Sequence, residues 1–171
     1  MFKLKSQYKI PADVKTVFTI MRDEFKDYWK DLPNIQSFKV LEEKNLKDKK
    51  KLVKIEWTGK APIPALLKHL LSPKMLKWVD RGVWDEKDFT LIWESKTYFY
   101  SDIFTCRGNW YIKKDGKHKN SSLVILDGFI DIAMPVFGMI AEKIVAKYLM
   151  ENLKKAEKNL IELVRSKLCL N

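Results

Sequence analysis

Apolar and polar residues alternate over much of the chain up to residue 132, and a helical period follows toward the end. Phe2, Leu4, Tyr8 and Ile10 are separated by lysines and other polar residues, which predicts a strand with one buried face. From Met139 to Asn171 there is no proline or glycine. Apolar residues recur there every three or four positions, which predicts one long amphipathic helix.

The chain between these two ends divides into short elements. Helical spacing over Ala12–Met21, and a second segment through Tyr28 and Trp29, predict two short helices after the first strand. Polar turns indicate two hairpins, the second one turning at residues 85–88. A slip in the alternation near Ser101 and Asp102 predicts a turn or bulge. The further strands are expected at Gln36–Glu42, Leu52–Thr58, Met75–Trp84, Phe89–Phe99, Phe104–Ile112 and Leu123–Ile132.

This order of elements predicts an α+β fold in a single domain that spans residues 1–171. Strands come first and one long helix closes the chain, so the helix has to bury its apolar stripe against the sheet. We therefore expect a curved antiparallel sheet that grips a long C-terminal helix. Such a grip leaves room for a ligand between the sheet and the helix.

The side chains that would surround this space follow from the alternation. In the strand expected at Phe89–Phe99 the odd residues are uncharged, whereas Glu94 and Lys96 have the other parity, so the odd residues face inward. Large aromatics on such a face form either the core or a pocket wall, and the core interpretation is favoured for any single tryptophan. The predicted ligand-binding residues are Trp57, Leu67, Trp93, Ser95, Thr97, Phe99, Trp110, Ile144 and Tyr148.

The segment Ala61–Pro73 is longer than a hairpin connection needs. One interpretation is an entrance lid whose leucines dip into a membrane, while Lys68 and Lys74 contact anionic headgroups. The other is a short helix that covers the end of the sheet. The sequence leaves both open.

The chain of 171 residues has a net charge of +11, which favours acidic partners. Only Arg22, Arg81, Arg107 and Arg165 are arginines, and lysine supplies the rest of the positive charge. Because base readout favours arginine, this composition suits a solvated face or an anionic membrane surface better than specific nucleic-acid binding. The two cysteines lack metal-site spacing, and no apolar run reaches the ~18 residues of a membrane span. We expect a cytoplasmic protein, with peripheral membrane contact left open.

The sequence carries no sign of a catalytic centre. His69 and His118 have no partner at metal-ligand spacing, and no nucleophile motif or glycine-rich phosphate loop is present. Asp127 and Asp131 are candidates for an acid pair, but two carboxylates on a wet strand face are the favoured explanation. No catalytic residue, metal or cofactor is predicted.

Two stretches carry a family resemblance. The opening from Tyr8 to Phe18, followed by Leu32-Pro33 before a strand, resembles the START-like helix-grip (SRPBCC) superfamily. That superfamily includes lipid-transfer proteins, polyketide cyclases and ubiquinone-binding proteins. A further set is similar in order to the PRELI-like phospholipid-transfer family: Glu56-Trp57, Pro64–Lys68, Trp84-Asp85, Ser95–Thr97 and Tyr111–Lys114. This resemblance implies a hydrophobic pocket under a lid loop and transfer of a phospholipid such as phosphatidic acid.

Three functions are compatible with these observations. The first is binding or transport of a hydrophobic or amphiphilic molecule, such as a lipid, a phospholipid or a quinone-like compound. The second is a cyclase- or hydrolase-like enzyme that uses the same pocket, and the third is a basic nucleic-acid-binding module. Ser95 or Thr97 without a titratable neighbour would favour the carrier, whereas a buried Asp or Glu beside the pocket would favour the enzyme.

Overall fold

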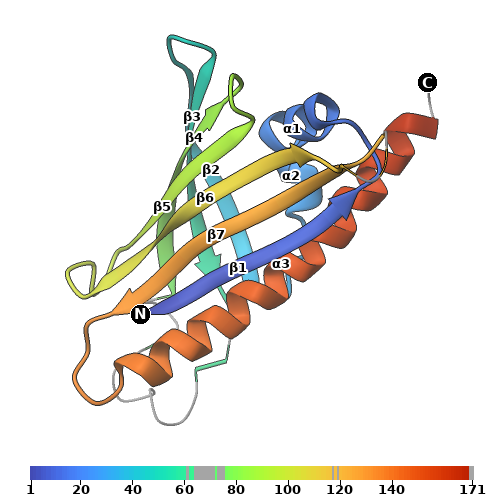
Figure 1. The fold of residues 1–171 in the computed structure, drawn as a ribbon. Helices are drawn as coiled ribbons and strands as arrows, with labels where there is room; N and C mark the ends of the chain where they lie inside the picture. Colours follow the sequence, from blue (N-terminus) through green and yellow to red (C-terminus); the bar gives the residue numbers. More distant parts are fainter. Residues whose placement is uncertain (61, 64–71, 73–75, 117, 119, 170–171) are drawn as a thin grey trace.

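The computed structural model describes residues 1–60, 62–63, 72, 76–116, 118 and 120–169. Seven antiparallel strands form one sheet in the spatial order β1-β7-β6-β5-β4-β3-β2, and a long helix lies along its concave face (Figure 1). The strands are β1 (Phe2–Ile10), β2 (Ile35–Asn45), β3 (Lys50–Gly59), β4 (Lys77–Asp85), β5 (Thr90–Thr97), β6 (Phe104–Lys114) and β7 (Ser122–Ile132). The helices are α1 (Val14–Asp23), α2 (Phe25–Tyr28) and α3 (Gly138–Cys169).

The predicted order of elements and the α+β helix-grip architecture are confirmed. The first strand pairs with the last, so that β1 and β2 form the two edges of the sheet. Two hairpins occur where the sequence predicted them, β2 with β3 and β4 with β5. None of the described helices combines the length and the hydropathy that a membrane crossing requires.

The turn predicted near Ser101 and Asp102 is present, but it begins earlier than expected. Strand β5 ends at Thr97, and the chain turns over residues 98–103. Tyr100 has a φ of 59°, in the left-handed region, which an extended strand does not allow. The N–H groups of Ile103 and Phe104 both donate to the carbonyl oxygen of Tyr100. Phe99 is therefore a turn residue and not, as expected, the last residue of the strand.

Helix α3 changes its role along its length. Ile144 and Tyr148 in its first half face a space enclosed by the sheet. Leu160 and Val164 in its second half are fully buried and pack in the same core cluster as Phe18 of α1. The first half thus forms a cavity wall, whereas the second half seals the core.

Two buried asparagines fix α3 against the segment that follows α2. Asn152 accepts a hydrogen bond from the backbone N–H of Asn34 at 2.9 Å. The side-chain amide of Asn159 donates to the carbonyl oxygens of Tyr28 and Lys30, each at 3.0 Å. Because these bonds join α3 to the backbone of another segment, they favour one position of the helix.

The two halves of α3 should respond differently to truncation. Leu160 has no exposed surface, so Leu160→Ala should lower the free energy of unfolding by roughly 2–5 kcal/mol, as core truncations do. Ile144→Ala, which enlarges an existing cavity, should cost clearly less. Chemical denaturation of the two variants measures the difference, and equal losses would contradict the division of roles.

Candidate functional site

A cavity of about 360 Å³ lies between the concave face of the sheet and the first half of α3. Strands β3 to β7 supply one wall and the helix supplies the other. At one end the lining includes Pro62, Phe99, Tyr100 and Met134, which come from the connections between elements. The cavity is therefore formed by regular elements along its length and by loops at its mouth.

Aromatic side chains dominate the walls of this cavity. Trp29 and Trp57 have ring centroids 5.1 Å apart, and Trp57 and Trp78 stack at 6.3 Å. The core interpretation that the sequence favoured for single tryptophans is incomplete, because all six line the cavity: Trp29, Trp57, Trp78, Trp84, Trp93 and Trp110. The curvature of the sheet brings these residues together from four strands and the end of α2.

Small residues on both neighbouring strands accommodate Trp93. In the register of the sheet Trp93 pairs with Gly82 of β4 on one side and with Gly108 of β6 on the other. A Cβ atom at Gly108 would lie 3.2 Å from the Trp93 ring and only 2.7 Å from the Cα of Gly128. Glycine at this position therefore permits both the close approach of β6 to β7 and the packing of the indole.

The structure places the described members of the predicted site around this one cavity. Their role in binding stays a prediction, since only their location is given by the structure. Phe99 lies at the mouth and is substantially exposed, in keeping with its position in the turn. Leu67, Lys68 and Lys74, together with most of the predicted lid, lie outside the described residues. The residues that line the cavity are Trp57, Trp93, Ser95, Thr97, Phe99, Trp110, Ile144 and Tyr148.

The wall also contains an acidic residue that is not among the predicted site residues. Asp80 of β4 pairs in register with Ser95 of β5, and the Ser95 hydroxyl donates a hydrogen bond to Asp80 Oδ1. The signal was available, because Asp80 has the same parity in its strand as Trp78 and Trp84. A charged residue on the inward parity of a strand is the exception that indicates a site.

Burial raises the pKa of Asp80 to about 6, because the carboxylate loses solvation. The hydrogen bond from Ser95 and the nearby indoles of Trp57 and Trp78 act in the opposite direction and limit the increase. Burial also raises the pKa of the neighbouring Cys106 thiol to about 12, and the negative charge of Asp80 adds to this effect. At neutral pH the site therefore holds a carboxylate beside a neutral thiol.

Several buried donors in the same wall are unsatisfied. The indole N–H groups of Trp57 and Trp93 and the hydroxyl of Thr97 meet no acceptor with hydrogen-bond geometry in the described part of the chain. The Trp57 indole is near enough to Asp80 to favour the charged carboxylate, but it does not reach hydrogen-bond geometry. Polar groups of this kind are rare in well-packed interiors and make this part of the wall a polar region in a largely apolar cavity.

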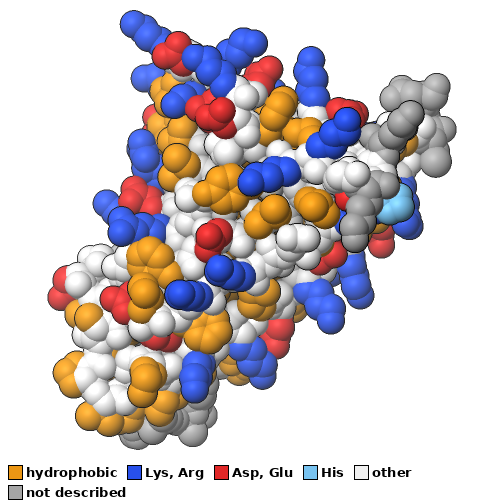
Figure 2. Space-filling view, viewed as in Figure 1, with side chains coloured by type: hydrophobic (Ala, Val, Ile, Leu, Met, Phe, Trp, Pro, Cys, Tyr) orange, Lys and Arg blue, Asp and Glu red, His pale blue; other side chains and the backbone are white. Residues whose placement is uncertain are grey.

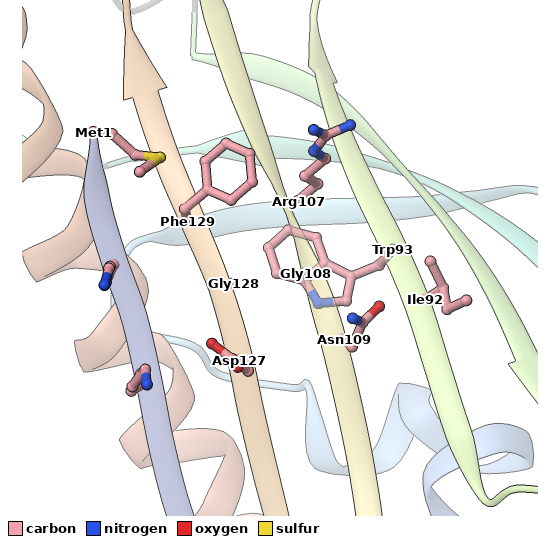
Figure 3. Close-up of a pocket in the computed structure, with 11 residues that line it drawn as sticks. Met1, Ile92, Trp93, Arg107, Gly108, Asn109, Asp127, Gly128 and Phe129 are labelled. Carbon is pink, nitrogen blue, oxygen red and sulfur yellow. The ribbon is translucent and has the colours of Figure 1, made fainter.

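A second hollow lies on the outer face of the sheet, above the glycine pair Gly108 and Gly128 (Figure 3). Its volume is about 520 Å³, but it is an open depression on the surface. Arg107 lies over the ring of Phe129, with the guanidinium carbon 5.2 Å from the centroid. Asp127 also faces this outer hollow and not the inner cavity, which agrees with its predicted place on the wet face. The enclosed inner cavity is the better candidate for ligand binding.

Comparison with known proteins identifies the fold. No family model and no curated protein matches this chain. Solved structures do match. The protein TTHA0849 from Thermus thermophilus is 20% identical with a TM-score of 0.69, covering 96% of this chain and 98% of its own. A START superfamily protein from Mycobacterium smegmatis is 16% identical with a TM-score of 0.59, covering 97% and 99%.

An enzyme has the same architecture. The Zhui aromatase/cyclase from Streptomyces sp. R1128 is 11% identical with a TM-score of 0.63, and the match covers 97% of this chain and 94% of that protein. The chain therefore has the START-like helix-grip fold, as the opening of its sequence indicated. Because a shared fold does not fix a function, the function has to be argued from the cavity itself.

Replacement of Asp80 by asparagine should stabilise the protein at neutral pH. The pKa of Asp80 is raised in the folded state, so the carboxylate opposes folding above pH 6, and this penalty is absent below the unfolded value of 3.8. We expect Asp80→Asn to raise the free energy of unfolding by about 1–3 kcal/mol at pH 7.5 and to have little effect near pH 4.

Chemical denaturation at the two pH values checks this prediction. Glu94→Gln, on the outer parity of the adjacent strand β5, removes the same charge and is the matched control. A loss of stability in Asp80→Asn at pH 7.5, or an equal gain in both variants, would show that Asp80 carries no such penalty.

Proposed function

We propose that this protein binds a hydrophobic or amphiphilic small molecule in the cavity between the sheet and α3. The observation that supports this most directly is the enclosed apolar space, lined by all six tryptophans and containing a small polar region. Sites for small molecules have this composition, with apolar walls and a few polar groups that fix the ligand's orientation. The ligand is therefore an apolar body with at least one polar group.

The cavity volume limits the size of the ligand. About 360 Å³ is near the lower end of the range of small-molecule sites. This favours a single-chain lipid or a compact ring compound, such as a quinone-like molecule, over a phospholipid with two acyl chains. The phospholipid transfer implied by the PRELI-like resemblance is thus the less favoured form of the proposal.

Exchange of the ligand at an anionic membrane is the second part of the proposal. Val136 and Met139, in and beside the connection from β7 to α3, are 86% and 73% exposed. They lie close in sequence to Met134 and Ala141, which line the cavity. Hydrophobic side chains also gather at this end of the molecule in the space-filling view (Figure 2). Exposed apolar side chains beside a cavity mouth, on a protein of net charge +11, are suited to an anionic membrane surface.

Asp80 favours a second candidate function, an enzyme acting on a hydrophobic substrate. A carboxyl group with a raised pKa near 6, bonded to a serine in a cavity, is suited to general acid–base catalysis. This is the buried acid that was expected to indicate the enzyme. Native mass spectrometry of purified wild type and Asp80→Asn separates the alternatives. An enzyme should retain a substrate of different mass in the variant, whereas the variant of a binding protein should retain either the wild-type molecule or none.

Filling the cavity should weaken binding of an apolar probe. N-phenyl-1-naphthylamine should bind wild type at about one molecule per chain, and Ile144→Trp should weaken binding tenfold or more, roughly 1.4 kcal/mol. Lys147→Trp is the matched control, because Lys147 is on the same helix but exposed. Fluorescence titration measures both. Equal affinity in the two variants would show that the probe does not occupy this cavity.

The apolar rim, Val136 and Met139, should determine membrane contact. The double variant Val136→Asp/Met139→Asp should bind vesicles of phosphatidylcholine and phosphatidylserine about tenfold more weakly than wild type, because two apolar contacts are replaced by repelled charges. Leu46→Asp makes the same kind of change between β2 and β3, at the opposite end of the molecule (Figure 1). Vesicle co-sedimentation measures the effect, and unchanged binding of the double variant would refute contact through this rim.

A further inference from the structure

The charge inside the cavity is opposite in sign to that of the protein. Asp80 is the only described lining residue that carries a formal charge at neutral pH, and no described lysine, arginine or histidine lines the cavity. The protein as a whole has a net charge of +11, with 33 basic residues. A carboxylate in an apolar cavity with no cation among the described lining residues is costly, so its presence here requires an explanation.

The described neighbours of Asp80 carry no positive charge. Ser95 of β5 donates a hydrogen bond to Oδ1, and the indoles of Trp57 and Trp78 favour the charged form, but these groups are all uncharged. Cys106, which pairs with Ser95 in the next strand, is a neutral thiol. Among the described residues, the carboxylate thus has hydrogen-bond donors but no positive charge beside it.

We propose that the cavity selects ligands that carry a protonated amine on an apolar body, with the ammonium group bound at Asp80. This inference rests on the proposed function and specifies the ligand class of that same site. An ammonium group supplies both the missing positive charge and N–H donors for the carboxylate oxygens. The indoles of Trp57 and Trp78 lie beside Asp80 and make this part of the wall aromatic, as suits the apolar body of such a ligand.

Other head groups fit the site less well. A hydroxyl group donates to Asp80 but leaves the negative charge without a partner. A carboxylate places a second negative charge beside the first and is repelled. An eight-carbon series that differs only in its head group therefore tests the inference: octylamine, 1-octanol and octanoic acid.

The experiment measures competition of each compound with bound N-phenyl-1-naphthylamine at pH 7.5. Wild type should bind octylamine at least tenfold more tightly than octanoic acid, with 1-octanol between them. In Asp80→Asn the preference for the amine over the alcohol should disappear, while the affinity for 1-octanol changes little. Glu94→Gln, which removes the same charge from the outer parity of β5, should retain the wild-type order.

The outcomes distinguish this inference from the proposed function. If the probe and all three compounds fail to bind, the binding function itself is wrong. If they bind but the amine is not preferred, or if the alcohol or the acid binds best, the binding function stands and amine selection is wrong. An amine preference that persists in Asp80→Asn would also overturn the role of Asp80. The order of affinities in wild type provides a test even if the variant fails to fold.

Discussion

One helix has to cover a sheet that is much wider than the helix, and the rest of the structure depends on this mismatch. Seven strands about 4.8 Å apart span roughly 29 Å, whereas a helix with its side chains is about 10 Å across. The sheet therefore curves around α3, and the remaining space has to be filled by large side chains or left as a cavity. Both occur here, at opposite ends of the same helix.

Two sets of residues explain why a cavity and a tight core occur along one helix: the tryptophans of the sheet and the asparagines of α3. In the second half of the helix Leu160 and Val164 close the core, and Asn159 bonds to the end of α2. Near the middle of the helix, Asn152 bonds to Asn34. In the first half, tryptophans from the sheet extend inward without filling the space. The cavity exists because the position of α3 is fixed where the core is tight, so the helix cannot collapse onto the sheet elsewhere.

The negative charge of Asp80 adds to the cavity a chemical property that its shape does not provide. A strongly basic surface encloses an apolar space whose one charged described residue is Asp80. Desolvation makes that carboxylate costly, and the raised pKa is the measure of this cost. A destabilising charged group in a cavity wall is typical of a functional site. This holds whether the carboxylate binds a ligand or exchanges a proton with it.

The sequence by itself determined the elements, their order and the inward parity of the strands, because strand and helix periodicities are local properties of the chain. It thereby identified Trp93, Ser95 and Thr97 as wall residues. It did not identify Asp80, although Asp80 shares its parity with Trp78, because an acidic side chain on a strand is usually on the solvent face. The register and the curvature of the sheet decided which of these residues meet. Only the tertiary structure brings Asp80 opposite Ser95 and gathers six tryptophans around one space, because these contacts depend on how distant strands pair and bend.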